Sequence, residues 1–281
     1  MKKIRKLNNI GVEYEFDLSL ANKDQILEFG KNLSKDNVVL LRNQSLNERE
    51  ILNVCETIGT VLKFKRFFIH PKYPGLYRVT NRRENNKKIG IFADKELDWH
   101  SNGNGRPSGK ECCVMLYCIE PGLNSVTSFC DTRQAYIDLP DDIKELCDNV
   151  DAVFQFKNNT FYDLDSDDME LELFNTKNIF PDGIIKPLVY THPFDGNKGL
   201  YFTFHYIQDW WDRRDKSKDI SWLKDYLMNH VFNNKYIYHH SDWKKGDMIF
   251  MDQFHSIHKR NAVEGDRFLY RVTLDYSNAI I

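Results

Sequence analysis

Two histidines far apart in the chain, His100 and His258, are the residues best suited to chemistry. His100 lies in the segment WHSN (99–102), and His258 follows the apolar run GDMIFM in the segment DQFHSIH. Side chains two positions apart on a strand share a face, so His100 and Asn102 would offer an imidazole and an amide oxygen to one ion. With one distant histidine, such a pair can cap one side of an iron ion and leave the opposite positions open. The spacing permits a metal site, although the chain has nine histidines and these two could instead be hydrogen-bonded structural residues.

The elements that would position these residues are mostly strands. Short runs rich in β-branched and aromatic residues recur along the chain, and turn signals bound them at Pro121-Gly122, Asp195-Gly196 and Gly246-Asp247. The runs are NVVLLRN, LYRVT, CCVMLYC, VTSF, DAVFQF, PLVY, GLYFTF, YIYHH, MIFMD and RFLYRVTLDY. They predict a core dominated by β-structure, with His100 and His258 each flanking a strand.

Helices are expected beside this core. Asn22 with Gln25, and Ser45 with Glu48, match the capping box that starts a helix, and an apolar-periodic stretch follows each pair. Further helices are expected at about 131–147, split by Pro140, and at 220–233.

Two polar stretches without periodicity, 80–97 and 157–172, are expected to be long loops. The first is basic in its first half and the second is acidic. Each is either a solvated surface loop or an active-site lid, because loops of this length in compact domains are often functional. No change in composition marks a linker, so residues 1–281 are expected to form a single domain.

Composition excludes several classes of protein. The 281 residues carry a formal net charge of −2 and are 41% apolar, which is typical of globular proteins and not of disordered chains, collagens or coiled coils. The balanced charge argues against a dedicated nucleic-acid binder. No stretch approaches the ~18 apolar residues of a membrane span, and the basic start is not followed by the apolar segment of a secretory signal. The six cysteines lie mostly in apolar runs without CxxC spacing, so we expect a soluble, cytoplasmic protein with reduced cysteines.

From about residue 11 to 276 the chain resembles the taurine dioxygenase (TauD/TfdA) family of Fe(II)- and 2-oxoglutarate-dependent oxygenases. The matching stretches, in order, are VVLLRNQSLNEREIL, IHPKYP, WHSN, SVTSFCDTRQAYIDLP, KPLVYTHPFDGNKGLYF and KKGDMIFMDQFHSIHKRNAV, which leads to GDRFLYRVTL. The resemblance implies a mainly β fold with flanking helices around a double-stranded β-helix, the jelly-roll core of cupin-like proteins. It also implies an Fe(II) ion, 2-oxoglutarate as co-substrate, dioxygen, and a small-molecule substrate that is hydroxylated.

The resemblance assigns roles to particular residues. His100 and His258 match the two histidine ligands of the metal, and His255, three positions before His258, is then a neighbouring or core residue. Thr127 and Arg267 match the residues that hold 2-oxoglutarate. An arginine suits that role because its planar guanidinium binds a carboxylate through two hydrogen bonds and keeps its charge.

Two further matches concern the substrate. His70 and Arg271 match positions that hold the sulfonate in the taurine enzyme, which suggests an anionic or zwitterionic substrate. Arg271 would lie on the same strand face as Arg267. The alternative is that Arg271 pairs with a local carboxylate. His192 matches a structural stretch of the family.

Asn102 departs from the family, which has Asp or Glu at this position. A neutral amide oxygen can coordinate a metal but leaves the site one unit more positive. Three interpretations are open: Asn102 is a ligand in a hydroxylase; it swings away and leaves room for chloride or water, as in halogenating relatives with Gly or Ala there; or the site is silent or redirected, as in a jelly roll that binds a small anion without turnover. Asp98 could supply the missing carboxylate instead. The sequence identifies neither the substrate nor whether the protein forms a homo-oligomer.

Overall fold

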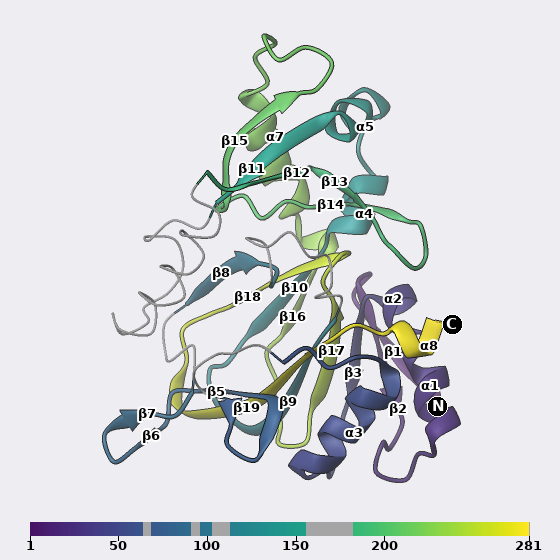
Figure 1. Ribbon diagram of the computed structural model, residues 1–281, viewed down its shortest axis with the longest axis vertical. Coiled ribbons are helices and arrows are strands. Elements are labelled where there is room, and N and C mark those ends of the chain that lie inside the picture. Colours follow the sequence, from purple (N-terminus) through teal and green to yellow (C-terminus); the bar gives the residue numbers. More distant parts are fainter. Residues whose placement is uncertain (64–68, 91–95, 103–112, 156–181, 281) are drawn as a thin grey trace.

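The computed structural model describes residues 1–63, 69–90, 96–102, 113–155 and 182–280 and consists mainly of strands (Figure 1). The larger sheet contains β1 (Lys2–Leu7), β2 (Gly11–Glu15), β3 (Val38–Leu41), β4 (Ile69–His70), β5 (Tyr73–Thr80), β9 (Cys113–Leu123), β17 (Met248–Asp252) and β19 (Glu264–Leu274). Its strand order is β1-β2-β3-β17-β9-β19-β5-β4. The smaller sheet contains β8 (Leu97–His100), β10 (Thr127–Asp131), β16 (Ile237–His240) and β18 (Ser256–Arg260), in the order β16-β10-β18-β8.

The two sheets pack face to face over a buried apolar layer. In β3, Val38 and Leu40 belong to this inner layer, whereas Val39 and Leu41 belong to a second layer on the opposite face of the sheet. Phe129 of β10 also belongs to the inner layer, which shows that the layer lies between the sheets. Both faces of the larger sheet are therefore buried. Continuous apolar runs such as VVLL follow from this, because a strand covered on both sides needs no polar alternation.

Helices cover the outer face of the larger sheet, where α1 (Lys23–Gly30), α3 (Glu48–Ile58) and the short α2 (Leu33–Asp36) and α8 (Ser277–Ile280) lie (Figure 1). The Asn22–Gln25 capping box of α1 is confirmed. The prediction for α3 was wrong by two residues. Asn47 caps this helix, because its side chain accepts from the backbone of Glu50 while the Glu50 carboxylate accepts from the Asn47 backbone.

A further group of elements lies beyond the smaller sheet, at the top of Figure 1. It contains β11 (Val150–Phe154), β12 (Ile184–Pro187), β15 (Ile207–Asp212), the hairpin of β13 (Val189–Thr191) and β14 (Lys198–Leu200), and the helices α4 (Thr132–Ile137), α5 (Asp141–Asp148), α7 (Trp222–Val231) and η1 (Asn234–Tyr236). The expected break at Pro140 is confirmed, since it separates α4 from α5. The expected strand GLYFTF ends at Leu200, because residues 201–206 bury aromatic rings without forming a ladder.

The first expected loop is only partly a loop. Within 80–97, β6 (Arg83–Glu84) and β7 (Lys87–Lys88) form a hairpin whose turn residues Asn85 and Asn86 have φ angles of 50° and 63°. Asparagine tolerates this left-handed conformation, and two such residues suit a tight hairpin turn. Residues 91–95 and the whole of 157–172 lie outside the described residues.

Two further findings concern the class of protein. In the ranges given above, no helix has the length and apolar composition needed to cross a membrane. Five cysteines are free and buried, as predicted, and Cys112 lies outside the described residues.

Candidate metal centre

His100 and His258 lie side by side on neighbouring strands. They are register partners of β8 and β18, and their ring centroids are 4.2 Å apart. Their chain neighbours Trp99 and Ile257 pack into the apolar layer beneath α4 and α7. Because side chains alternate along a strand, the two imidazoles point the other way, into the space between the sheets.

Both imidazoles are in the state that a metal requires. His100 Nδ1 donates to the backbone oxygen of Asp98 at 2.6 Å, so its Nε2 is the nitrogen that carries the lone pair. Burial, with a contribution from Arg271, lowers the pKa of His100 to about 4. Burial and the neighbouring His100 and Arg271 also hold the pKa of His258 well below its usual range. His258 Nδ1 is buried without a hydrogen-bond partner among the described residues, which leaves this nitrogen available to a ligand.

Asn102 follows β8 and has one side-chain partner. Its backbone N–H and its Nδ2 both donate to Gln253 Oε1, at 2.9 and 3.1 Å. Within the described part of the chain no donor reaches Asn102 Oδ1. The alternative carboxylate, Asp98, is already engaged: it pairs with His205 at 2.7 Å and accepts the backbone N–H of Trp99. The pairing with His205 is the main reason why the pKa of Asp98 is lowered.

Arg267 and Arg271 lie on the face of β19 that carries Leu269, a member of the inner layer. Arg267 is only 3% exposed, and its guanidinium donates to Ser125 Oγ at 3.0 Å. Among the described residues no carboxylate lies within ion-pair distance of it. Burial, and next the charge of Arg260, lower the pKa of Arg267 to about 9, so it stays charged at neutral pH at a cost. A buried guanidinium that has no carboxylate beside it is well suited to bind an anionic ligand.

Thr127 faces the same space from β10. It shares its face with Phe129, a member of the inner layer, and is buried. Its Oγ1 accepts a hydrogen bond from Trp243 Nε1 at 3.1 Å. The hydroxyl proton therefore remains free to donate to another acceptor, such as a carboxylate.

The described contacts do not bring His70 to this site. Its ring packs against Tyr73 and Tyr270, with centroid distances of 5.0 and 6.0 Å. Tyr270 lies on the opposite face of β19 from Arg271 and donates to Glu48 on the helix-covered side. The role of His70 in substrate binding stays a prediction.

A second buried cluster contains His192, Asp252 and His255, whose potential ligand atoms lie within 4.8 Å of one another. Hydrogen bonds already use most of these atoms. His192 Nδ1 accepts from the backbone N–H groups of residues 194 and 195, so its Nε2 donates to Asp252 at 3.0 Å, and Tyr276 donates to the same carboxylate. Asp252 also accepts the backbone N–H of His255. We interpret this cluster as a network that fixes the turn leading to His258.

Several residues of the site were not predicted. Arg260 follows His258 by two positions on β18, and strand alternation could have identified it. No sequence signal marks Ser125, Trp243 or Gln253, because each reaches its partner across the fold.

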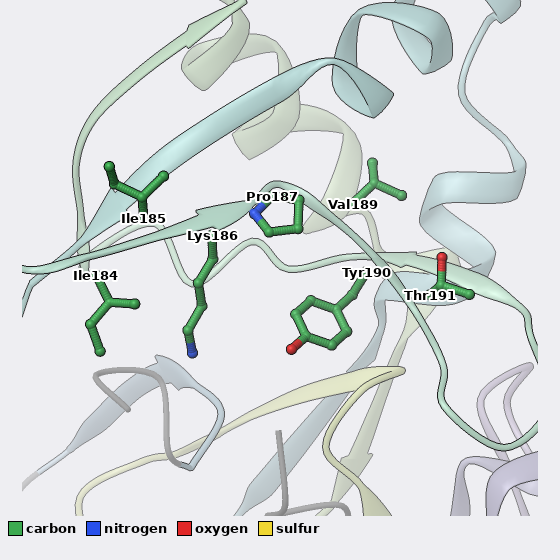
Figure 2. A pocket seen from close by; sticks show the side chains of 7 residues that line it. All are labelled: Ile184, Ile185, Lys186, Pro187, Val189, Tyr190 and Thr191. Carbon is green, nitrogen blue, oxygen red and sulfur yellow. The ribbon is translucent and has the colours of Figure 1, made fainter. Parts of the chain in front are cut away.

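One cavity adjoins the turn that carries Gln253. It has a volume of 330 Å³ and is lined by residues of β12 and β13. Figure 2 shows Lys186 and Tyr190 pointing to the same side of this ribbon, opposite to Val189. The Tyr190 ring lies 5.5 Å from that of Phe254, the residue after Gln253. The cavity thus has a lysine and a tyrosine on one side, and the tyrosine packs against the turn.

Comparisons with known proteins agree with the fold. The family model described as "Taurine catabolism dioxygenase TauD, TfdA family" matches residues 3–273. The alpha-ketoglutarate-dependent 2,4-dichlorophenoxyacetate dioxygenases of a Burkholderia species (strain RASC) and of Cupriavidus pinatubonensis are each 24% identical to the chain, over 89% and 94% of it and 85% and 93% of their own lengths.

Two crystal structures are similar in fold. The first, of AAD-2 with Mn(II) and N-oxalylglycine, has a TM-score of 0.71 at 20% identity and covers 98% of this chain and 97% of its own. The second is described as a putative alpha-ketoglutarate-dependent taurine dioxygenase from Burkholderia xenovorans. It has a TM-score of 0.69 at 20% identity, over 95% and 89% of the two chains. These likenesses confirm the predicted jelly-roll architecture.

Proposed function

Because the chain belongs to the TauD/TfdA family, and so to the non-haem iron, 2-oxoglutarate-dependent dioxygenases, we propose that His100, His258 and Asn102 hold its Fe(II) ion. Its co-substrates are 2-oxoglutarate and dioxygen, and its substrate is a small molecule. The proposed reaction is hydroxylation of an anionic or zwitterionic molecule.

One observation carries the metal assignment: the buried imidazole of His100 and the half-buried imidazole of His258 lie with ring centroids 4.2 Å apart, and the pKa of each is lowered, which favours the neutral form. Neutral imidazole is the form that ligates metals. With Nδ1 of His100 donating to the Asp98 carbonyl, the lone pair of its Nε2 would be one donor to the ion, and the unpartnered Nδ1 of His258 would be another. Asn102 Oδ1, which no described donor reaches, supplies an oxygen. Two nitrogens and one oxygen fit the facial arrangement of non-haem iron sites.

Arg267 and Thr127 are proposed to bind 2-oxoglutarate. The buried guanidinium of Arg267 would form two parallel hydrogen bonds with a carboxylate, and the free hydroxyl proton of Thr127 would add a third. Both side chains are almost fully buried, so water competes little for the anion.

With iron and 2-oxoglutarate bound, dioxygen would be the oxidant: 2-oxoglutarate would supply two electrons and become succinate and CO2, and the second oxygen atom would go into the substrate. The protein contributes by orienting the co-substrate and the substrate and by excluding water from the site. The histidines face the space between the sheets, and the guanidinium and hydroxyl groups fix the co-substrate beside them. The stretches 80–97 and 157–172 remain proposed as active-site lids on the basis of their sequence.

Two features support an anionic or zwitterionic substrate. Arg271 is close enough to His100 and His258 to lower the pKa of both, so a cation lies beside the proposed iron site. The two curated relatives act on 2,4-dichlorophenoxyacetate, which is a carboxylate. A cytoplasmic location suits the free, buried cysteines, and a homo-oligomer stays a prediction.

A second candidate function follows from Asn102. Its neutral side chain leaves open halogenase-like or otherwise redirected radical chemistry, or an anion-binding jelly roll that keeps Arg267 but does not turn over. In the last case the protein would bind 2-oxoglutarate without forming succinate.

The test is an anaerobic titration of the purified protein with Fe(II) and 2-oxoglutarate, monitored through the visible charge-transfer band of the chelated pair. Oxygen is then admitted and succinate is measured. The proposal requires both the band and succinate, and both should be lost in His258→Ala but kept in His239→Ala, which changes an exposed histidine of β16. Binding of 2-oxoglutarate without a band or succinate would refute the dioxygenase and favour the anion-binding protein.

A further inference from the structure

We infer that Gln253 is a positioning residue that holds the Asn102 amide with its nitrogen toward Gln253 and its oxygen offered to the metal. The inference rests on the proposed function, because it concerns how the unusual ligand of that metal site is oriented. It goes further by assigning a role to a residue for which the sequence gives no signal.

The orientation follows from which atoms can donate. The backbone N–H of Asn102 can only donate, so the Gln253 atom 2.9 Å from it must be the oxygen, Oε1. The same Oε1 lies 3.1 Å from the Asn102 amide, and an oxygen that only accepts requires the NH2 group there. A single backbone group therefore fixes both side-chain amides. The Asn102 oxygen is the end that Gln253 leaves free.

The turn that carries Gln253 is itself held rigidly. The carboxylate of Asp252, the preceding residue, accepts hydrogen bonds from two backbone N–H groups of the turn. It also accepts hydrogen bonds from the side chains of His192 and Tyr276. Phe254, the following residue, packs edge-on against His192 at a centroid distance of 5.1 Å. Gln253 is 4% exposed, so its side chain has little freedom to move. A fixed acceptor of this kind is what holds a metal ligand in one orientation.

Gln253 and Asn102 are matched to each other. An aspartate at position 102 would place a carboxylate oxygen next to Gln253 Oε1, and two acceptors repel. Rotation of the Gln253 amide would relieve that contact, but it would turn Nε2 toward the backbone N–H, and two donors would then face each other. The glutamine thus favours asparagine over the acid that the family has at this position.

The side-chain NH2 group of Gln253 takes part in neither of the hydrogen bonds that Gln253 forms with Asn102. Its Nε2 is buried and has no hydrogen-bond partner within the described ranges. A buried amide donor without an acceptor is unfavourable, so packing alone does not explain a glutamine here. A glutamate at position 253 would keep both accepted hydrogen bonds and remove this donor, which makes Gln253→Glu the conservative variant.

The experiment measures Co(II) binding by titration calorimetry and by the visible spectrum of the bound ion, in the full-length protein. We expect Gln253→Leu to weaken Co(II) binding about 10- to 100-fold, and Gln253→Glu to restore it to within about threefold of the original protein. The control Gln208→Leu, at a half-buried glutamine whose amide makes only long hydrogen bonds of 3.3–3.5 Å, should bind Co(II) normally. The melting temperature of each metal-free variant distinguishes lost positioning from lost folding.

The outcomes separate this inference from the proposed function. If the unsubstituted protein binds Co(II) and Gln253→Leu binds it equally well, the positioning role is refuted while the metal site stands. If the unsubstituted protein does not bind Co(II), both are refuted. A second variant gives an independent check: Asn102→Asp should strengthen Co(II) binding more in the Gln253→Leu protein than in the original one, and an equal gain in both would contradict the matching of the two residues.

Discussion

Replacing Arg267 with methionine should make the metal-free protein more stable. The guanidinium is buried, and its only described side-chain partner is the neutral Ser125 hydroxyl. Burial lowers its pKa from that of an exposed arginine to about 9. At 1.36 kcal/mol per pH unit this corresponds to a cost of roughly 5 kcal/mol for keeping the charge in the fold. Methionine fills a similar volume without charge but forfeits the hydrogen bond to Ser125, so we expect a net gain of about 1–4 kcal/mol in the free energy of unfolding.

The contribution of Arg267 to the free energy of unfolding depends on pH, and the direction of this dependence follows from its pKa. Arg267 is a base whose pKa in the fold, about 9, lies below its pKa in the unfolded chain, so the unfolded chain binds more protons at pH values between these two pKa values. Stability from this group therefore rises with pH across that window. Below about pH 9 the cost is present in full, and urea unfolding at pH 7.5 detects it.

The assay compares the original protein, Arg267→Met and Arg267→Lys in a buffer free of phosphate and carboxylates. Without ligand, Arg267→Met should unfold at the highest urea concentration. With Mn(II) and N-oxalylglycine, an analogue of 2-oxoglutarate, the original protein should gain stability, Arg267→Lys less because it loses the two-pronged contact, and Arg267→Met little. If Arg267→Met is less stable than the original protein without ligand, the guanidinium is not an uncompensated buried charge and the reasoning fails.

Two further substitutions test the surroundings of the site. Thr127→Val keeps the shape but loses the free hydroxyl proton, so the affinity for 2-oxoglutarate should fall about 3- to 10-fold while calorimetry shows unchanged Co(II) binding; an equal loss of Co(II) affinity would contradict this role. Asp252→Asn should lower the free energy of unfolding by about 2–3 kcal/mol at pH 7, because hydrogen bonds from His192 and Tyr276 outweigh burial and lower the pKa of this carboxyl. That stabilisation is present above the unfolded pKa of 3.8 and is lost as the pH falls through the lower folded pKa, so urea unfolding from pH 7 to pH 3 should show the two proteins converging.

Much of the fold could be predicted from local patterns. Runs such as VVLL and MIFMD identify strands because both faces of the larger sheet are covered. Asn22 and Pro140 mark helix boundaries through local hydrogen bonding and ring geometry. The N-terminal hairpin of β1 and β2 was not predicted, because exposed lysines obscure its alternation. Residues 201–204 were mistaken for a strand because buried aromatic rings look alike in a strand and in a packed turn.

The residues of the candidate site also fall into two groups: those that local sequence patterns identify and those that they do not. Residues on strands, such as His100, His258 and Arg267, could be identified because alternation and the family pattern determine which way they face. Gln253 could not, because its contact with Asn102 joins positions 151 residues apart and depends on the path of a turn. His70 shows the converse. Its sequence match suggests the substrate, yet the described contacts place it on the helix-covered face of the sheet.

The neutral amide of Asn102 has a consequence for how metal and co-substrate bind. Two imidazoles and an amide leave the full double charge on the ion, so a dianion such as 2-oxoglutarate should bind far better when the metal is present. Linkage then requires the metal to bind more tightly by the same factor when the dianion is present. We expect N-oxalylglycine to tighten Mn(II) binding at least about tenfold in the original protein and less in Asn102→Asp, whose site is one unit less positive. Because this factor is a ratio within one variant, the misfit of the new carboxylate with Gln253 largely cancels, and calorimetry in both orders of addition measures it. Equal factors in the two proteins would show that Asn102 does not contribute to the charge around the ion.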